Sequence, residues 1–242
     1  FIPSIQQSGS NGQSGVYSLE NPRSPIAEAF RSLRTNIEFA AVPAQLNSLL
    51  ITSSGPKEGK STVASNLAAI MVQGGKTVAI VDADLRRPFL HKYYKFENRI
   101  GLSEYFRDEV SLNDTFNYVD PTRRLIAIPS GKLPPNPAEL LNSSKMNLLL
   151  EELSNQVDFI ILDSPPLVVT DPVVLSTKVD GVLFVVQPTI TKFNSAKVSL
   201  EQLERAQARL IGIVMNNINR PVSYTHLRAH ETVLDLVCRL LL

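Results

Sequence analysis

The chain has 242 residues, of which 43% are hydrophobic and 19% charged, and this length is ample for one α/β domain with a continuous core. Its formal net charge of +1 argues against general phosphate neutralisation on nucleic acid, although a local basic patch stays open. A single cysteine excludes a disulfide scaffold, a Cys-rich zinc module and an intrachain iron–sulfur cluster, and it fits a reducing compartment. Any metal site is therefore expected to use oxygen ligands.

Residues 1–20 are expected to form a flexible linker. Twelve of them are Ser, Gly, Gln or Asn, and the first charge is Glu20. Such a segment buries too little apolar surface to offset its ordering entropy. The chain begins with Phe1, without a basic region before an apolar run, so we expect a fragment with no signal peptide. No apolar run approaches the roughly 20 residues that span a bilayer.

Beyond the linker, strands and helices alternate. Ser24 is a suitable N-cap with Pro25 at the first helical position, and apolar residues recur at helical spacing up to about Ala41. Apolar runs predict strands at 48–52, 77–81, 125–128, 159–162, 182–186 and 211–215, and helices are expected at 60–73, 101–107, 137–155 and 193–210. Continuous apolar strands indicate burial on both faces. We therefore predict a single α/β domain over 21–220, with a parallel sheet and helices on both faces.

The turn after the first strand reads S-S-G-P-K-E-G-K-S-T over 53–62. Backbone N–H groups of such a loop hold an anion, Lys60 would reach the β- and γ-phosphates, and the Ser61 hydroxyl would ligate Mg²⁺. The match is imperfect, since Ser54 stands where the first glycine is usual. The alternative is an ordinary strand–helix turn with a solvent-facing lysine. The predicted ATP contacts are Gly55, Pro56, Lys57, Glu58, Gly59, Lys60, Ser61 and Thr62.

Two acidic strand ends favour the phosphate site. Asp82 and Asp84 follow the strand at 77–81, and Asp163 follows the strand at 159–162. Ligands of open α/β sheets bind at the carboxyl ends of strands, where these carboxylates would meet the loop and a magnesium ion. A single aspartate here would be a turn residue or a helix cap. Three of them, each after an apolar strand, favour the metal site.

Asn216 follows the last predicted strand, in M-N-N-I-N over 215–219. This is the place of a base-recognition loop, where an amide can hydrogen-bond a nucleobase. The acidic residue that reads guanine is replaced by asparagine, which favours adenine.

Three motifs together resemble the cytoplasmic domain of the bacterial tyrosine kinases (BY-kinases) of capsule and exopolysaccharide synthesis. They are the loop above, V-A-I-V-D-A-D-L-R over 78–86 and I-I-L-D-S-P-P over 160–166. The resemblance runs from about Ser24 to Asn219. Other partition-type P-loop ATPases carry a signature lysine five residues before the loop lysine, where this chain has Gly55. The redox members of that class need two cysteines per chain, which this sequence lacks.

The resemblance implies a P-loop fold and autophosphorylation on tyrosine in trans, with ATP and Mg²⁺. It implies that Thr62 helps to hold phosphates, that Asp82 accepts the tyrosine proton, and that Asp84 and Asp163 order the waters of the metal. The alternative is a partition-type ATPase that acts as a nucleotide-dependent dimerisation switch without kinase activity. Carried over to this chain, the catalytic residues are Lys60, Asp82 and Asp84, and the metal residues are Ser61, Asp84 and Asp163.

Glu28, Arg31 and Arg34 form an E-x-x-R-x-x-R stripe on the first long helix. The stripe is either a solvated face with weak local pairs or, as the resemblance implies, a contact that closes a ring of subunits. The resemblance also implies a membrane-spanning activator or chain-length regulator, a cognate tyrosine phosphatase, no nucleic acid, and a cytoplasmic place at the inner face of the membrane.

Residues 221–242 do not fit the resemblance, because family members end in clustered tyrosines and only Tyr224 occurs here. We expect an atypical tail, an assembly artefact, so that the isolated chain autophosphorylates poorly; the alternative is a real helix docked on the sheet edge. Two further residue pairs stand apart from these motifs. Arg86–Arg87 is expected to be a solvated turn that lacks a phosphate-clamp role, and Tyr93–Tyr94 is expected to be surface packing.

Overall fold

The computed structural model describes residues 1–4, 16–42 and 44–218. Its strands form one sheet in the order β3-β4-β2-β5-β1-β6-β7. Neighbouring strands run parallel, except that the short β3 is antiparallel to β4, so the predicted parallel sheet is confirmed with one exception. The strands are β1 (Ser48–Ser53), β2 (Val78–Asp82), β3 (Asn117–Tyr118), β4 (Leu125–Ile128), β5 (Phe159–Asp163), β6 (Gly181–Val186) and β7 (Leu210–Met215).

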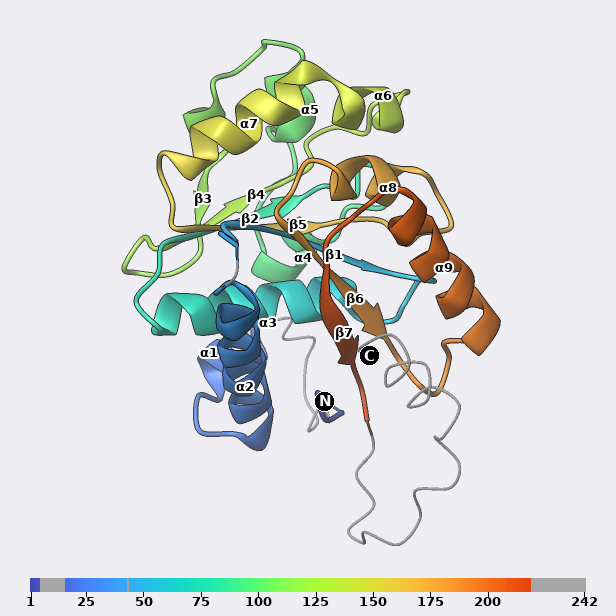
Figure 1. The fold of residues 1–242 in the computed structure, drawn as a ribbon. Helices are drawn as coiled ribbons and strands as arrows, with labels where there is room; N and C mark the ends of the chain where they lie inside the picture. Colours follow the sequence, from blue (N-terminus) through green and yellow to red (C-terminus); the bar gives the residue numbers. More distant parts are fainter. Residues whose placement is uncertain (5–15, 43, 219–242) are drawn as a thin grey trace, which may run out of the picture.

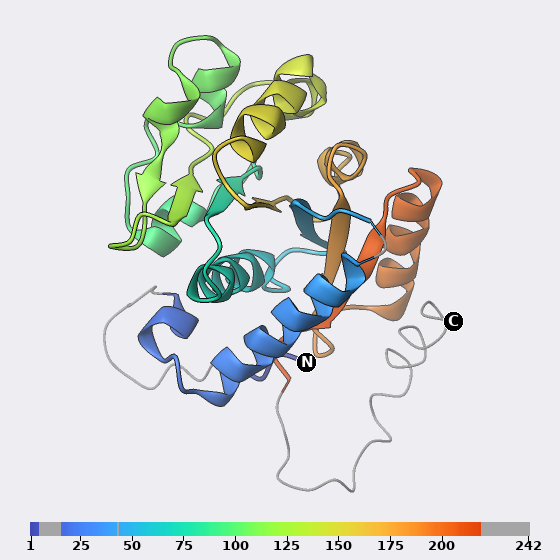
Figure 2. The same ribbon diagram turned by 60° about the vertical axis from the view of Figure 1, so that its left-hand side comes forward.

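Helices cover both faces of this sheet (Figure 1). One face carries α1 (Tyr17–Glu20), α2 (Pro25–Ala40), α3 (Lys60–Gln73) and α4 (Leu90–Tyr94). The other carries α5 (Leu102–Phe106), η1 (Leu112–Thr115), α6 (Pro137–Asn142), α7 (Ser144–Ser154), α8 (Asp171–Ser176) and α9 (Phe193–Arg205). The turned view separates the three layers, with α2 lying across α3 (Figure 2). The predicted α/β class, with helices on both faces, is confirmed.

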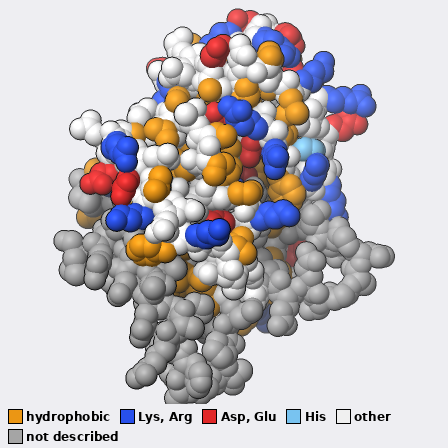
Figure 3. Space-filling view, turned by 90° about the vertical axis from the view of Figure 1, so that its right-hand side faces the viewer, with side chains coloured by type: hydrophobic (Ala, Val, Ile, Leu, Met, Phe, Trp, Pro, Cys, Tyr) orange, Lys and Arg blue, Asp and Glu red, His pale blue; other side chains and the backbone are white. Residues whose placement is uncertain are grey.

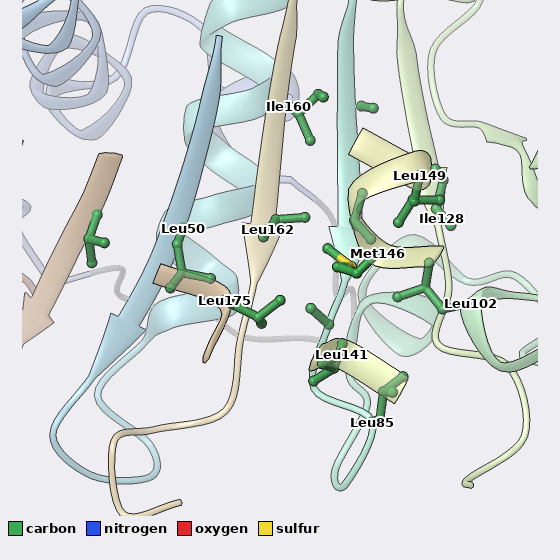
Figure 4. Packing of buried hydrophobic residues seen from close by; sticks show 14 of the residues in the cluster. Leu50, Leu85, Leu102, Ile128, Leu141, Met146, Leu149, Ile160, Leu162 and Leu175 are labelled. Atoms are coloured by element: carbon green, nitrogen blue, oxygen red, sulfur yellow. The ribbon is translucent and has the colours of Figure 1, made fainter. Parts of the chain in front are cut away.

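Apolar side chains fill both interfaces between the sheet and its helices. Successive residues of a strand point to opposite faces, so Leu50 belongs to one hydrophobic cluster while Leu49 belongs to the other. Figure 4 shows Leu50 and Leu162 of the sheet beside Met146 of α7 and Leu175 of α8. Both clusters are buried, which explains why the strands are continuously apolar in the sequence.

A local signal sets the start of α2. The Ser24 side chain accepts a hydrogen bond from the backbone N–H of Ala27 at 3.1 Å, as its predicted capping role requires. The expected helix over 137–155 is instead two helices, α6 and α7, separated at Ser143. Ser143 has an extended backbone (ψ 161°), and its hydroxyl bonds to the Leu140 carbonyl at 2.6 Å. Such local side-chain bonds compete with helix continuation.

Parts of the expected linker over 1–20 pack against the domain. Ile2 is 1% exposed, and its backbone N–H donates to the carbonyl of Met215 at 2.8 Å. Ser18 of α1 is fully buried, and its N–H donates to Asn66 of α3 at 2.8 Å. The composition of residues 1–20 predicts flexibility, but burial of a few apolar side chains offsets the entropy cost of ordering these parts. The linker residues 5–15 lie outside the described part of the chain.

The atypical tail over 221–242 also lies outside the described residues, so both of its alternatives stay predictions. Within the ranges that the structure describes, no helix combines the length and the apolarity that crossing a membrane requires.

Candidate active site

The phosphate loop lies between β1 and α3, at the carboxyl edge of the sheet. Lys57 (φ 65°) and Gly59 (φ 91°) both have left-handed backbone conformations. A Cβ at residue 59 would lie 2.0 Å from Nδ2 of Asn216, so the loop requires glycine there for space as well as for conformation. Lys60 begins α3 and is 8% exposed. The loop thus presents the N-terminus of a long helix, together with a lysine, to an anion.

Glu58 points inward from this loop. Its Oε1 accepts hydrogen bonds from the hydroxyls of Ser54 at 2.8 Å and Thr191 at 2.6 Å, and its Oε2 accepts from the N–H of Gly55 at 3.2 Å. The side chain expected to contact ATP is therefore engaged within the protein. Sequence reasoning missed Thr191, because nothing local marks a partner 133 residues away.

Asn216 holds the same loop from the end of β7. Its Nδ2 donates to the backbone carbonyl of Glu58 at 3.1 Å, and its own N–H donates to the Val186 carbonyl at 2.8 Å. The side-chain donor expected to read a base is thus bound to the loop, and contact between Asn216 and a nucleobase stays a prediction.

Asp82 and Asp163 lie side by side at the carboxyl ends of β2 and β5, where they are register partners. Both are buried, and in each the Oδ1 atom has no hydrogen-bond partner among the described residues. Oδ2 of Asp82 accepts from the backbone N–H groups of Phe89 and Leu90, both at 2.9 Å. The structure therefore brings these two predicted site residues together and leaves one oxygen of each free.

Burial dominates the protonation of this pair. It raises the pKa of Asp82 well above the ordinary value, and the neighbouring Asp163 raises that pKa further. Burial likewise raises the pKa of Asp163 to about 6, against the opposing effects of the Lys60 ammonium and the Ser61 hydroxyl. Two adjacent buried carboxylates with free oxygens fit the donor set of a hard cation such as Mg²⁺.

The protein alone does not complete such a cation site. Among the described residues, no three His, Cys, Asp or Glu side chains are close enough to hold a metal ion together. A magnesium ion here would also need the Ser61 hydroxyl, water and phosphate oxygens. This matches the expectation that Asp84 and Asp163 act through waters, which stays a prediction.

The turn after β2 is fixed by Asp84 and Arg86. Oδ1 of Asp84 accepts from the backbone N–H groups of Arg86 at 3.2 Å and Arg87 at 2.9 Å. The Arg86 guanidinium forms two hydrogen bonds to the buried carboxylate of Asp171, at 2.7 and 3.0 Å. Arg86 is exposed, as expected of a solvated turn, but its guanidinium is also held by a partner that lies 85 residues away, at the start of α8, which the sequence did not indicate.

Tyr93 also departs from the sequence expectation. It is 8% exposed, and its hydroxyl accepts a hydrogen bond from Nδ2 of Asn66 at 3.2 Å. Burial raises the pKa of Tyr93 to about 12. Surface packing is therefore the wrong description of this residue, since α4 turns it toward α3.

The E-x-x-R-x-x-R stripe lies on α2, and its members already make contacts within one chain. Arg31 forms a 2.8 Å salt bridge with the exposed Glu28. Arg34 donates to the backbone carbonyl of Ile70, near the end of α3, at 3.1 Å. A contact between subunits through these residues stays a prediction.

Figure 3 looks onto the side of the molecule that lies at the right of Figure 1. Lysine and arginine side chains are spread among exposed apolar ones on this face, and acidic side chains lie between them in several places.

Comparisons with known proteins agree with this geometry. A family model described as ParA, NUBPL iron-transfer P-loop NTPase, matches residues 46–226. Tyrosine-protein kinase YwqD of Bacillus subtilis is 39% identical over 209 residues, which cover 86% of this chain and 88% of that kinase. Tyrosine-protein kinase ptk of Acinetobacter johnsonii is 35% identical over 85% of this chain, but the match spans only 28% of that longer protein.

Solved structures give the same result. The kinase domain of the Escherichia coli tyrosine kinase ETK superposes with a TM-score of 0.83 at 31% identity, covering 93% of this chain and 91% of that one. A MinD protein of Pyrococcus horikoshii, complexed with Mg-ADP, has a TM-score of 0.63 at 20% identity over 78% of this chain and 77% of that one, which shows a shared fold alone.

Proposed function

The chain belongs to the bacterial tyrosine kinases within the ParA-like P-loop NTPases, and we propose that its site transfers the γ-phosphoryl group of ATP to a tyrosine. The observation that carries the proposal is the buried pair Asp82 and Asp163, each with a free oxygen, beside a loop that begins a helix with Lys60. The loop can bind phosphate groups, and the two carboxylates can bind a cation and accept a proton.

The phosphate end of ATP would be held by backbone N–H groups of the loop, by Lys60 and by Thr62. Ser61, Asp84 and Asp163 would hold Mg²⁺ with its waters. When bound, that ion would neutralise charge on the phosphate oxygens, which is the main requirement of phosphoryl transfer. Positioning supplies most of the remaining acceleration.

Asp82 is the group proposed to accept the proton of the incoming tyrosine hydroxyl. Its Oδ2 is fixed by two backbone N–H groups, which orients the carboxylate, while the buried Oδ1 has no hydrogen-bond partner among the described residues. Because burial raises its pKa, the ionised carboxylate is a stronger proton acceptor than an exposed aspartate.

The names of the relatives support a wider role. One of them, from Klebsiella pneumoniae, is named a putative tyrosine-protein kinase in the cps region, and another is CpsD of Streptococcus agalactiae. We place this chain in the control of capsule or exopolysaccharide synthesis, at the cytoplasmic face of the membrane. A membrane-spanning activator, a ring of identical subunits and a cognate phosphatase are parts of the same proposal.

The test is transfer from γ-labelled ATP, with Mg²⁺, to a tyrosine-containing acceptor peptide. We expect phosphotyrosine, and we expect Asp82→Asn to lower its rate by at least about 100-fold, the lower limit for loss of a general base. Asp108→Asn, which changes an exposed carboxylate, should keep the wild-type rate. ATP hydrolysis without any phosphotyrosine would instead identify a partition-type nucleotide switch.

A further inference from the structure

We infer that Glu58 is a positioning residue, which joins the phosphate loop to the turn after β6 through the hydroxyl of Thr191. The inference rests on the proposed function, because it concerns how the same loop is prepared for a nucleotide. The side chains of Glu58 and Thr191 would contact neither the phosphates nor the tyrosine. They would act by holding the loop in its binding conformation.

The carboxylate of Glu58 is placed for this role. The residue is 2% exposed, and its side chain accepts three hydrogen bonds inside the protein. Two of these bonds come from Ser54 and Gly55, so they close the loop on itself. The third comes from Thr191 and leaves the loop for another part of the chain. A buried carboxylate stabilises a structure only when its oxygens are satisfied in this way.

Thr191 is itself fixed by the turn that follows β6. The backbone N–H of Gln187 donates to the Thr191 hydroxyl oxygen at 2.9 Å, and the N–H of Thr191 donates to the Gln187 carbonyl at 2.8 Å. The hydroxyl thus accepts one bond within the turn while its proton is donated to Glu58. The hydroxyl oxygen of Thr191 thus takes part in both bonds, one to the turn and one to the phosphate loop.

The backbone explains why this connection matters for binding. Glu58 lies between Lys57 and Gly59, both in the left-handed region, and that conformation is unfavourable for a lysine. The backbone carbonyl of Glu58 is also held, by Asn216. Two contacts therefore fix the loop at Glu58. Its side chain bonds to Thr191, in the turn after β6, and its backbone carbonyl bonds to Asn216, directly after β7. A loop that is ordered beforehand binds more tightly because less conformational entropy is lost on binding.

The first experiment measures the affinity of the whole chain for Mg-ADP by isothermal titration calorimetry. Thr191→Val keeps the shape but removes the hydroxyl, and we expect affinity to fall by about tenfold. Thr191→Ser retains the hydroxyl and should bind within about twofold of wild type. The matched control is Thr189→Val, because the Thr189 hydroxyl bonds to the Gln187 side chain in the same turn and does not contact Glu58.

The second experiment tests the pair. We expect Glu58→Gln to weaken Mg-ADP binding. The double variant with Thr191→Val should bind Mg-ADP as tightly as the single variant of lower affinity, because both substitutions remove the same hydrogen bond. Glu104→Gln removes another buried carboxylate, which bonds to the N–H of Gly101, and should lower thermal stability without changing affinity. In peptide phosphorylation, Thr191→Val should raise the KM for ATP and leave kcat within about twofold, which a merely structural role would not predict.

The outcomes separate the two proposals. A wild-type chain that does not bind Mg-ADP contradicts the proposed function. Normal wild-type binding, with Thr191→Val and Glu58→Gln binding equally well and only melting earlier, overturns the positioning role alone.

Discussion

Arg86 illustrates how one side chain stabilises the turn that carries Asp84. Its guanidinium is 42% exposed, but the carboxylate of Asp171 that it binds is completely buried. Replacing Arg86 by alanine would leave that carboxylate without its charged partner. We expect Arg86→Ala to lower the free energy of unfolding by about 3 kcal/mol, measured by urea denaturation.

The lysine variant tests the geometry of the same pair. A lysine keeps the charge but cannot form two parallel bonds to one carboxylate, so Arg86→Lys should recover only part of the loss. Arg87→Ala is the matched control, since Arg87 is exposed and alanine retains the backbone N–H that bonds to Asp84. Full recovery by lysine would contradict the importance of the paired bonds.

Tyr93 predicts a loss of stability at alkaline pH. Its pKa is raised to about 12 in the folded chain, against about 10 in an unfolded one. Between these values the folded chain retains a proton that the unfolded chain has lost. The stabilisation is therefore complete below pH 10 and disappears as pH rises toward 12, with a loss of about 1 kcal/mol expected by pH 11.

Urea denaturation between pH 9 and 11 measures this dependence. Tyr93→Phe should flatten the fall in stability by that amount, because the group that ionises has been removed. Tyr118→Phe, at a residue 46% exposed, should keep the wild-type slope. An unchanged slope in Tyr93→Phe would assign the effect to other groups.

At the scale of single elements, α2 depends on its cap. The Ser24 hydroxyl oxygen satisfies the N–H of Ala27, one of the unpaired donors in the first turn. Ser24→Ala should lower the free energy of unfolding by about 1 kcal/mol, whereas Ser24→Gly should cost only a few tenths. Ser32→Ala, in the exposed middle of the same helix, provides the comparison, and thermal denaturation can rank the three variants.

Elements with strong local signals were predictable. The helix over 60–73 and the strand over 125–128 have the expected limits, because Gly59 and continuous apolar runs mark them in the sequence. The short α4 and α8 were missed, since neither extends beyond six residues and packing determines them more than periodicity does. The predicted site residues of β2 and β5 do lie together, because parallel strands end at one edge.

The contacts that sequence reasoning could not find join distant residues. Glu58 with Thr191 and Arg86 with Asp171 are pairs separated by 133 and 85 positions, and no motif links their members. Both pairs use charged residues that a motif search assigns to ligand or solvent. Their partners become visible only when the sheet order is known.

For the whole molecule, the stripe on α2 predicts assembly. Among the described residues Arg31 bonds to Glu28 and to the Pro22 carbonyl, both near the start of α2, so Arg31→Ala should change the free energy of unfolding by less than about 0.5 kcal/mol. Arg34 also bonds to α3, so Arg34→Ala should cost about 1 kcal/mol. Light scattering after size exclusion should show oligomers for wild type and monomers for both variants. A monomeric wild type would contradict the predicted ring.

The sheet order also affects how the chain folds. β1 carries the phosphate loop and lies between β5 and β6, whose residues follow it at 159–163 and 181–186. During synthesis β1 therefore has no pairing partner until β5 and β6, and with them most of the domain, have left the ribosome. Closing such long loops is entropically costly, so such topologies fold slowly and expose aggregation-prone strands meanwhile. A nascent chain truncated before β6 would consequently be a substrate for chaperones, even though its loop, lysine and all three aspartates have already been synthesised.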